Sequence, residues 1–466
     1  MPLSLPGYAG DWLERGLDRQ LRLAVTGLSR AGKTAFLTSL VNQLRHAGLD
    51  ARLELMGCVR EGRLLGAMRQ SQPDLSVPRF PYDEALASLE GTPPGWPSPT
   101  RGISELRLSI RYKSRAGSRH LFGEQRSLTL DLIDYPGEWL LDLPMLQLDY
   151  WQWCEQMAGQ LRGRRRSYAE DFLRHAERLD PAADADEQQL ADISARYADS
   201  LASARNEGGY TWVQPGRFLL PGELDGAPVL QFFPLPAIAE HSRTALDALP
   251  ASSNYQTLAR RFEHYKRTVI TPFYRQYFRR FDRQIVLVDV LSALNAGPDV
   301  FDDLRQAIAT LMQSFDYGNR SLLSRLFQPR IDRLAIAATK ADHVTPEQHA
   351  NLLSLVEALM AEPLRDLRYA NIPVRALSLA AIRATSARQV EHHGERHAAL
   401  KGTTLDGEEV LMFPGEVPSR LPDADFWQRQ GFDFTAFRPA PQAAGEALPH
   451  IRMDSALDWL LGDKLR

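Results

Sequence analysis

Residue types suited to chemistry appear first near the N-terminus, where an apolar run leads into a glycine-rich loop. Residues 23–26 precede Gly27-Leu-Ser-Arg-Ala-Gly-Lys-Thr34, which fits G-x-x-x-x-G-K-[ST]. In this pattern the glycines let backbone N–H groups point at phosphate oxygens, Lys33 neutralises the β/γ charge, and the Thr34 hydroxyl binds Mg²⁺. Apolar residues at helical spacing follow over 34–45. The predicted nucleotide-binding residues of this loop are Gly27, Ser29, Arg30, Ala31, Gly32, Lys33, Thr34 and Ala35.

A second motif ends a predicted strand. Residues 103–112 and 127–134 alternate apolar and polar positions, which predicts two adjacent strands in a hairpin. The second strand ends in Asp134-Tyr-Pro-Gly137, a D-x-x-G pattern. An aspartate there can hold Mg²⁺ through a water, and the glycine can offer its N–H to a γ-phosphate. We assign Asp134 to the metal and Gly137 to the phosphate.

Residues 91–102 are too rich in proline and glycine for a helix or an inner strand, so we predict a loop. Thr100 lies next to the strand that leads to Asp134, where a switch threonine would close over Mg²⁺ and the γ-phosphate. Thr92 in the same loop is the alternative. We predict that Thr100 is both a metal ligand and part of the catalytic set.

Two further apolar runs, 283–290 and 333–338, predict strands buried on both faces. The second ends in Thr339-Lys340-Ala341-Asp342, a T-K-x-D pattern that selects guanine. A carboxylate at the fourth position can accept the N1–H and N2–H₂ of guanine, and the lysine stem can lie over the ring. Thr345 to Gln348 reads as a helix start with a capping box. A last strand brings Ser378 and Leu379 as candidates for backbone contact with the guanine carbonyl.

In this order the motifs resemble those of the translation-factor-like class of P-loop GTPases, over about half the chain. Two positions depart from that pattern. Thr339 replaces the usual asparagine, which removes an amide that ties the base loop to the phosphate loop. Glu138 stands where many such GTPases have a glutamine that orients the attacking water, so it is the candidate for that catalytic position.

Longer segments resemble the YcjX family of bacterial P-loop proteins over essentially the whole chain. They are Asp134-Tyr-Pro-Gly-Glu-Trp139, the Trp-Pro-x-Pro-Thr-Arg-Gly-Ile-Ser loop, Leu230-Gln-Phe-Phe-Pro-Leu-Pro and Pro449-His-Ile-Arg-Met-Asp with the Leu-Leu-Gly-Asp-Lys-Leu that follows. The resemblance implies a cytoplasmic, stress-associated GTP-binding protein and does not supply a substrate.

The phosphate loop is also similar to that of guanylate-binding proteins and atlastins, which carry an arginine at the position of Arg30. That resemblance implies an arginine that swings onto the phosphates in cis when two subunits meet. Such an arginine stabilises charge that develops on the transferring phosphoryl group. Arg101, beside the switch threonine, is the competing candidate.

Composition narrows the remaining function classes. The 466 residues carry a net charge of −3, which gives no global attraction for nucleic acid or anionic lipid. Only Cys58 and Cys154 are present, without disulfide or zinc spacing, and no apolar run is long enough to span a membrane. We therefore expect a cytoplasmic protein. Basic clusters in the middle of the chain leave open an acidic partner or a peripheral membrane contact.

We predict a three-layer α/β P-loop fold of the G-domain kind, with a large helical insert after switch II and a C-terminal extension. The predicted parts are a helical lead-in over 1–20, a discontinuous P-loop domain over 21–138 and 282–390, a mainly helical insert over 139–281, and a C-terminal extension over 391–466 that ends in a helix. The helices predicted in the insert span 146–161, 168–179, 187–204 and 258–281.

The predicted function is a GTPase switch with Mg²⁺ and GTP or GDP as ligands, coupled to a protein partner or to self-association through the switches and the insert. One alternative is a nucleotide-gated binding module in which hydrolysis is incidental. An ATPase is the other, although it would have no use for T-K-x-D.

Overall fold

The computed structural model describes residues 20–28, 31–115, 125–236, 238–314, 331–369, 372–392, 395–429 and 431–466. Contacts divide the chain into two units. The first comprises Met1–Tyr135, Phe281–Leu291 and Tyr317–Arg466, and the second comprises Pro136–Arg280 and Ser292–Asp316. The predicted lead-in lies outside the described residues except for Gln20, which already belongs to the first strand.

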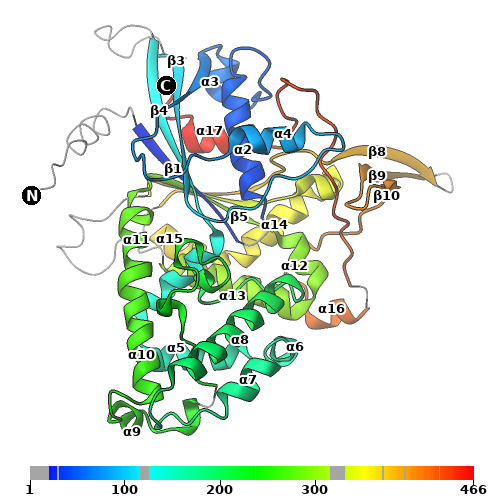
Figure 1. The fold of residues 1–466 in the computed structure, drawn as a ribbon. Helices are drawn as coiled ribbons and strands as arrows, with labels where there is room; N and C mark the ends of the chain where they lie inside the picture. The colour runs from blue at the N-terminus through cyan, green and yellow to red at the C-terminus, as the bar shows by residue number, and fades with distance from the viewer. Residues whose placement is uncertain are drawn as a thin grey trace, which may run out of the picture. The chain divides into compact units, whose positions relative to one another are not determined.

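A central sheet organises the first unit (Figure 1). Its seven described strands are β1 Gln20–Gly27, β2 Leu64–Gln70, β3 Ser104–Lys113, β4 Gln125–Asp134, β5 Arg283–Val288, β6 Arg333–Ala338 and β7 Val374–Ser378. Their order across the sheet is β2-β3-β4-β1-β5-β6-β7. The predicted hairpin is present, because β3 and β4 pair antiparallel, with Ser104 opposite Asp134.

Five neighbouring strands, from β4 through β1, β5 and β6 to β7, run parallel. Their registers align the carboxyl ends: Gly27 lies opposite Leu287, Val288 opposite Ala338, and Ala338 opposite Ser378. The loops that leave parallel strands at a common edge form the usual ligand crevice of an open α/β sheet. The topology therefore gathers the predicted motifs at one edge of the sheet.

Helices cover both faces of this sheet, which confirms the predicted fold class. The helices of the first unit are α2 Lys33–Arg45, α3 Gly57–Arg60, α4 Tyr82–Leu89, the start of α12 Val290–Ala296, α14 His349–Leu359, α15 Ala361–Tyr369, α16 Ala424–Arg429 and α17 Met453–Leu461. On one face, apolar side chains of α2 and α17, among them Phe36 and Leu457, join one buried cluster with alternate residues of the strands. Outside this cluster, α14 contacts β6 and β7, and α15 contacts β7.

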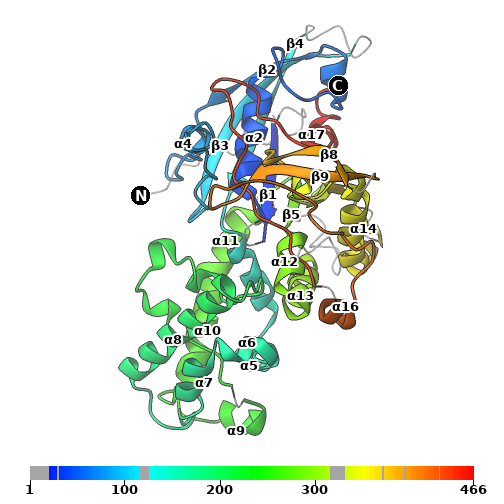
Figure 2. The ribbon, with the colours of Figure 1, turned by 90° about the vertical axis from the view of Figure 1, so that its right-hand side faces the viewer.

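The C-terminal segment adds a small antiparallel sheet, which is visible in both ribbon views (Figures 1 and 2). Its strands are β8 Thr385–His392, β9 Glu395–Thr403 and β10 Glu409–Met412, in the order β10-β9-β8. The chain then returns, and α17 packs into the core of the central sheet, as its amphipathic pattern predicts.

The second unit is helical. Its elements are the 3₁₀ segment η2 Gly137–Gln147, α5 Tyr150–Gln160, α6 Gly163–Ser167, α7 Glu170–Ala176, α8 Glu187–Asn206, α9 Arg243–Asp247, α10 Asn254–Tyr265, the π-turn η7 Lys266–Ile270, α11 Thr271–Gln276, the end of α12, and α13 Pro298–Ser314. Short 3₁₀ turns fill the proline-rich stretch that precedes α9, Gly216–Phe218 among them. Trp153 lies at the centre of an aromatic core with Phe232 and Phe262.

The largest differences from the predicted helix boundaries in this unit occur at two places. The helix expected from 146 begins at Tyr150, after the 3₁₀ segment that contains Pro144, and Asp149 closes a capping box with Gln152. The helix expected over 258–281 is interrupted by η7. Residues 292–316, predicted as part of the P-loop domain, group by contacts with the second unit.

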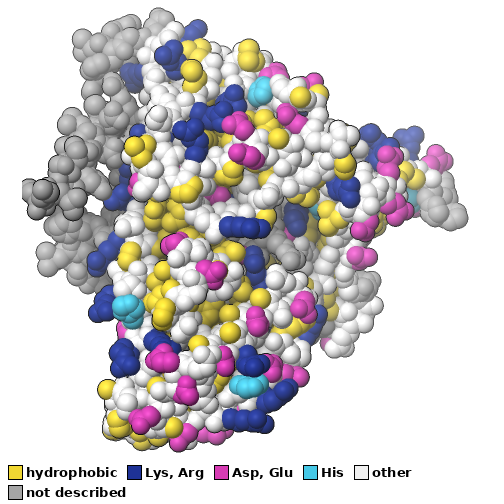
Figure 3. All heavy atoms as spheres, viewed as in Figure 1, with side chains coloured by type: hydrophobic (Ala, Val, Ile, Leu, Met, Phe, Trp, Pro, Cys, Tyr) yellow, Lys and Arg dark blue, Asp and Glu magenta, His cyan; other side chains and the backbone are white. Residues whose placement is uncertain are grey.

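Figure 3 shows basic and acidic side chains interspersed over the described part of one face of the molecule. This mixture matches the nearly balanced totals of 55 Lys and Arg against 58 Asp and Glu.

Candidate functional site

The phosphate loop joins β1 to α2. Gly32 precedes α2 at φ 77°, in the left-handed region that glycine adopts without strain. A Cβ on Gly27 would lie 3.4 Å from the Cβ of Ala31, so the loop is closely packed there. The N–H groups of Lys33, Thr34 and Ala35 lie in the first turn of α2, where backbone N–H groups have no carbonyl partner within the helix. The other two predicted loop residues, Ser29 and Arg30, lie outside the described residues.

Lys33 reaches the end of β4 with a side chain that is only 10% exposed. Its ammonium lies 3.2 Å from Asp134 Oδ1 and donates a hydrogen bond to the carbonyl oxygen of Tyr135. The cation of the phosphate loop and the D-x-x-G motif are therefore in direct contact.

Three oxygen-bearing side chains meet beside Lys33. Thr34 Oγ1 lies 3.3 Å from Thr100 Oγ1, and Thr100 donates a 2.6 Å hydrogen bond to Asp134 Oδ2. Asp134 is buried, and its Oδ1 accepts no hydrogen bond from the described residues. Thr92, the alternative switch threonine, is exposed. Hydroxyl and carboxylate oxygens are the donors that Mg²⁺ prefers, so this set fits the predicted metal.

Tyr135, inside the D-x-x-G motif, ties three strands together below the phosphate loop. Its hydroxyl lies 2.7 Å from Thr26 Oγ1, which also accepts from Gln284 Nε2 at 2.7 Å. Burial raises the pKa of Tyr135 well above its usual range, so the phenol stays protonated. The ring stacks on Phe281, with ring centres 6.0 Å apart.

The T-K-x-D loop leaves β6 at the same edge of the sheet. The Thr339 hydroxyl donates to the carbonyl oxygen of Val288 at 3.3 Å, in place of the amide that an asparagine would offer. Lys340 adopts φ 59° and its ammonium lies 2.5 Å from Asp289 Oδ2. Asp289 follows β5 directly and belongs to no motif, so in the sequence only its position after an apolar run could have singled it out.

Asp342 is buried and engaged within the first unit. Its Oδ2 accepts the Ala384 N–H at 2.6 Å, and its Oδ1 lies 3.2 Å from His343 Nδ1. Burial alone would raise the pKa of Asp342, but the His343 charge and these hydrogen bonds outweigh it and hold the pKa below its usual value. Asp342 therefore remains a carboxylate.

The last predicted base contacts lie at the end of β7. Ser378 is buried, and its hydroxyl accepts from Arg452 at 3.3 Å. The Leu379 N–H donates to the carbonyl oxygen of Ala338 at 2.9 Å, so in this arrangement it is already used within the sheet.

The capping box predicted at Thr345 does not form. Thr345 precedes a 3₁₀ turn without a side-chain cap, because Gln348 bonds Gly415 and Val417 of the C-terminal extension instead.

The second unit begins at Pro136, so Gly137 and Glu138 belong to it, whereas Asp134 and Tyr135 of the same motif belong to the first unit. Glu138 is buried there and forms an ion pair with Arg205 of α8. Arg101 is exposed. Thr34, Thr100 and Asp134 are thus brought together with Lys33, whereas Glu138 is held by the helical unit.

Comparison with known proteins identifies the family. The YcjX-like family, DUF463, matches residues 21–465. The chain belongs to the YcjX-like family. A protein of Escherichia coli (strain K12) named "Ras-like GTPase YcjX" is 50% identical over 455 residues, which cover 97% of this chain and 98% of that protein. A protein of the same name from Shewanella oneidensis is 43% identical over 467 residues, 97% of this chain and 96% of that protein.

The match confirms the resemblance that the motif segments indicate. The central sheet is therefore the sheet of a P-loop protein of this family. Among the described helices, none is long and apolar enough to cross a membrane.

Proposed function

We propose that this chain binds and hydrolyses GTP with Mg²⁺ and uses the nucleotide state as a switch. The observation that carries the proposal is the contact of Lys33 with Asp134, beside the oxygens of Thr34 and Thr100, at the carboxyl edge of the parallel strands. The name of the two relatives, Ras-like GTPase, supports the same conclusion.

In this proposal Lys33 exchanges its contacts with Asp134 and Tyr135 for the β- and γ-phosphates, and the first N–H groups of α2 bind phosphate oxygens. Thr34 and Thr100 would hold Mg²⁺ directly and Asp134 through a water. The ion would supply charge neutralisation on the β- and γ-oxygens.

Hydrolysis requires a water oxygen to attack the γ-phosphorus in line as the bond to the β–γ bridging oxygen breaks. We assign Glu138 to orient that water as a hydrogen-bond acceptor, which requires the Arg205 ion pair to open or to turn with it. Arg30, or alternatively Arg101, would place a guanidinium on the phosphoryl oxygens where charge develops.

Guanine selection is assigned to Asp342, with Lys340 over the ring and Asp289 positioning the lysine. For Asp342 to accept the N1–H and N2–H₂ of the base, its hydrogen bond with the Ala384 N–H or its contact with His343 must break. Ser378 and Leu379 complete the proposed base site.

The switch is proposed to act through the two ends of the helical insert. The chain leaves the first unit after Tyr135 and returns at Phe281, and these two buried rings stack on each other. Because Lys33 bonds the Tyr135 carbonyl oxygen, a nucleotide that draws Lys33 away changes a contact at this joint.

The segment just beyond the joint is fixed inside the helical unit. Trp139 donates to the Leu220 carbonyl oxygen at 3.1 Å and carries the Arg217 guanidinium 3.2 Å from its ring centre. Glu138 is held by Arg205. Movement of Gly137 toward a γ-phosphate would therefore pull on the helices.

Stress association comes from the family resemblance alone, and a protein partner or self-association through the switches and insert is what a switch would need. Cytoplasmic location is supported by two buried free thiols, Cys58 and Cys154.

A nucleotide-gated binding module with incidental hydrolysis is the second candidate, favoured by the ion pair that occupies Glu138.

Fluorescent GTP, ATP and XTP analogues titrated into wild type and Lys33→Ala, with phosphate release measured in parallel, test the proposal. We expect GTP to bind in preference to ATP, and Lys33→Ala to lose Mg-GTP binding or hydrolysis with its cooperative melt intact, because the ammonium lies outside the apolar core. Lys401→Ala, which removes an exposed lysine of the small sheet, is the matched control. Wild-type turnover in Lys33→Ala would refute the P-loop assignment, and equal ATP affinity would restore the ATPase alternative.

A further inference from the structure

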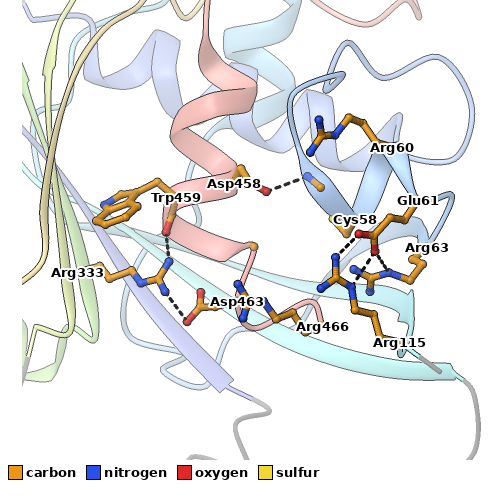
Figure 4. A pocket seen from close by; sticks show the side chains of 12 residues that line it. Cys58, Arg60, Glu61, Arg63, Arg115, Arg333, Asp458, Trp459, Asp463 and Arg466 are labelled. Carbon is orange, nitrogen blue, oxygen red and sulfur yellow. Dashed lines mark hydrogen bonds and ion pairs between the residues drawn. The ribbon is translucent and has the colours of Figure 1, made fainter. Parts of the chain in front are cut away.

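A pocket of about 370 Å³ lies in the first unit near the C-terminal end of α17, away from the phosphate loop (Figure 4). Arg333, on its wall, is the first residue of β6, whereas Thr339 of the base loop follows the last. Six residues of strand rise roughly 20 Å. The pocket and the proposed nucleotide site are therefore at opposite edges of the sheet.

The lining of this pocket is strongly cationic. It contains five arginines, Arg60, Arg63, Arg115, Arg333 and Arg466. It contains three side-chain carboxylates, so its positive side chains exceed the negative ones by two, in a chain whose side chains sum to −3. Figure 4 shows Arg333 on one side of the end of α17 and Arg63 and Arg115 on the other.

Two of the carboxylates are already committed to arginines of the wall. Glu61 accepts from Arg63 Nε at 2.6 Å and also from Arg115. Asp463 binds the buried Arg283 at 2.5 Å and lies 3.3 Å from Arg333. The contacts with Glu61 orient Arg63 and Arg115, and both side chains still line the pocket.

The third carboxylate, Asp458, uses Oδ1 to accept the Gly57 N–H at 2.9 Å. Gly462 keeps the space beside it open, because a Cβ there would lie 2.8 Å from the same oxygen. The three carboxylates thus hold the residues around the pocket in position.

Arg60 and Arg466 remain as uncommitted charges. Both are exposed, and neither side chain has a hydrogen-bond or ion-pair partner among the described residues. Trp459 offers no open stacking face for a base, because Arg333 lies 5.0 Å and Arg375 5.9 Å from its ring centre. A ligand would be recognised by its charge.

We propose that this pocket binds a small, multiply charged phosphate compound, a phosphomonoester or pyrophosphate group. Guanidinium groups bind phosphate oxygens in bidentate pairs, and the two without partners add donors to a pocket wall that carries three further arginines. The volume suits a small molecule, since ligand pockets run from about 300 to 1,000 Å³. An extended acidic peptide would need a longer groove. The phosphate could belong to a free metabolite or to a lipid headgroup.

Isothermal titration of the full chain with inorganic pyrophosphate tests this in a Lys33→Ala background, which removes the phosphate-loop cation and makes the result independent of GTP binding. We expect one pyrophosphate per chain. Arg60→Gln combined with Arg466→Gln should weaken it at least tenfold. Arg368→Gln with Arg420→Gln removes the same charge from exposed positions elsewhere and should leave the affinity within twofold. Hydrogen exchange should slow over 57–63 and 458–466 when pyrophosphate binds.

No pyrophosphate binding, an equal loss in both arginine pairs, or unchanged affinity in the Arg60 and Arg466 variant would each overturn the proposal. Arg60→Gln alone, at an exposed position, keeps the test available if the double variant fails to fold. Vesicles of phosphatidic acid in phosphatidylcholine distinguish the two sources. Sedimentation with them that pyrophosphate displaces would assign a lipid headgroup, and its absence alongside pyrophosphate binding would assign a free phosphate compound.

Discussion

Replacing Gly216 by alanine should disturb the segment that follows the D-x-x-G motif. A Cβ at this position would lie 2.0 Å from the carbonyl oxygen of Glu138 and 2.4 Å from its carbonyl carbon. Heavy atoms in such contacts stay at least about 3 Å apart, so the two backbones must separate by roughly 1 Å. Relaxation is restricted, because the Gly216 N–H is bonded to Asp142 Oδ1 at 2.7 Å and Glu138 is ion-paired with Arg205.

The expected loss of unfolding free energy in Gly216→Ala is about 1–3 kcal/mol, the usual cost of overpacking. If Glu138 orients the attacking water, a shift of about 1 Å lowers kcat by up to ~100-fold, with a smaller change in GTP affinity. Denaturant unfolding and single-turnover GTP hydrolysis measure the two effects.

Gly159→Ala is the matched control in the same unit, because Gly159 lies in α5 with open space around its Cβ position. Removing a glycine from a helix should leave the protein unchanged or stabilise it by up to about 1 kcal/mol. Equal stability and equal kcat in wild type and Gly216→Ala would refute the argument that this close approach positions Glu138.

Three further predictions use single substitutions. Asp342→Asn should weaken GTP and favour XTP, because an amide can donate to the extra xanthine carbonyl; nucleotide titration would contradict the base assignment if GTP affinity were unchanged. Arg30→Ala, if Arg30 is the cis finger, should lower kcat by roughly 10³-fold with GTP affinity within a few fold, whereas the same result in Arg101→Ala alone would move the finger to switch I. Burial raises the pKa of Asp142 to about 6 from 3.8 unfolded. The folded state therefore favours the protonated acid, and about 3 kcal/mol of stability present at low pH is lost as pH rises through 6. Asp142→Asn should flatten this slope in denaturation series at pH 4.5 and 7.5, and parallel slopes would contradict it.

The strands that carry the site were predictable because their patterns are local. The runs over 283–290 and 333–338 are mainly apolar, and in each the strand ends close to a polar residue of the loop that follows it. Alternation over 103–112 and 127–134 likewise gives the hairpin and places Asp134 at a strand end.

Other elements depend on contacts that no local pattern contains. β2 is an edge strand whose side chains are mostly exposed, so Leu64–Gln70 lacks a buried stripe and is defined by its pairing with β3. The β8–β9 hairpin begins inside a segment that reads as the end of the P-loop domain. Gln348 had the right spacing for a capping box, but contacts with the C-terminal extension use its amide.

The predicted site residues could be named from the sequence, but their partners could not. Lys340 and Asp289 are separated by a helix-rich stretch, and only the parallel pairing of β5 and β6 brings their loops together. Tyr135 and Thr26 meet for the same reason across β1 and β4. The spacing of residues in a motif identifies the chemistry of its loop, whereas the registers between strands determine which side chains hold that loop in place.

These restraints bear on how a nucleotide would be bound. Lys33 contacts Asp134 and the Tyr135 carbonyl oxygen, Lys340 contacts Asp289, and Asp342 is bonded to the Ala384 N–H. Each of these three side chains thus has an internal partner that GTP must replace, so part of the interaction energy with the ligand is used to break these contacts. The same competition favours a switch over a constitutive binder. A γ-phosphate that displaces Lys33 from Tyr135 alters the joint at which the helical insert begins, whereas a ligand that left this contact intact would have no means of shifting it.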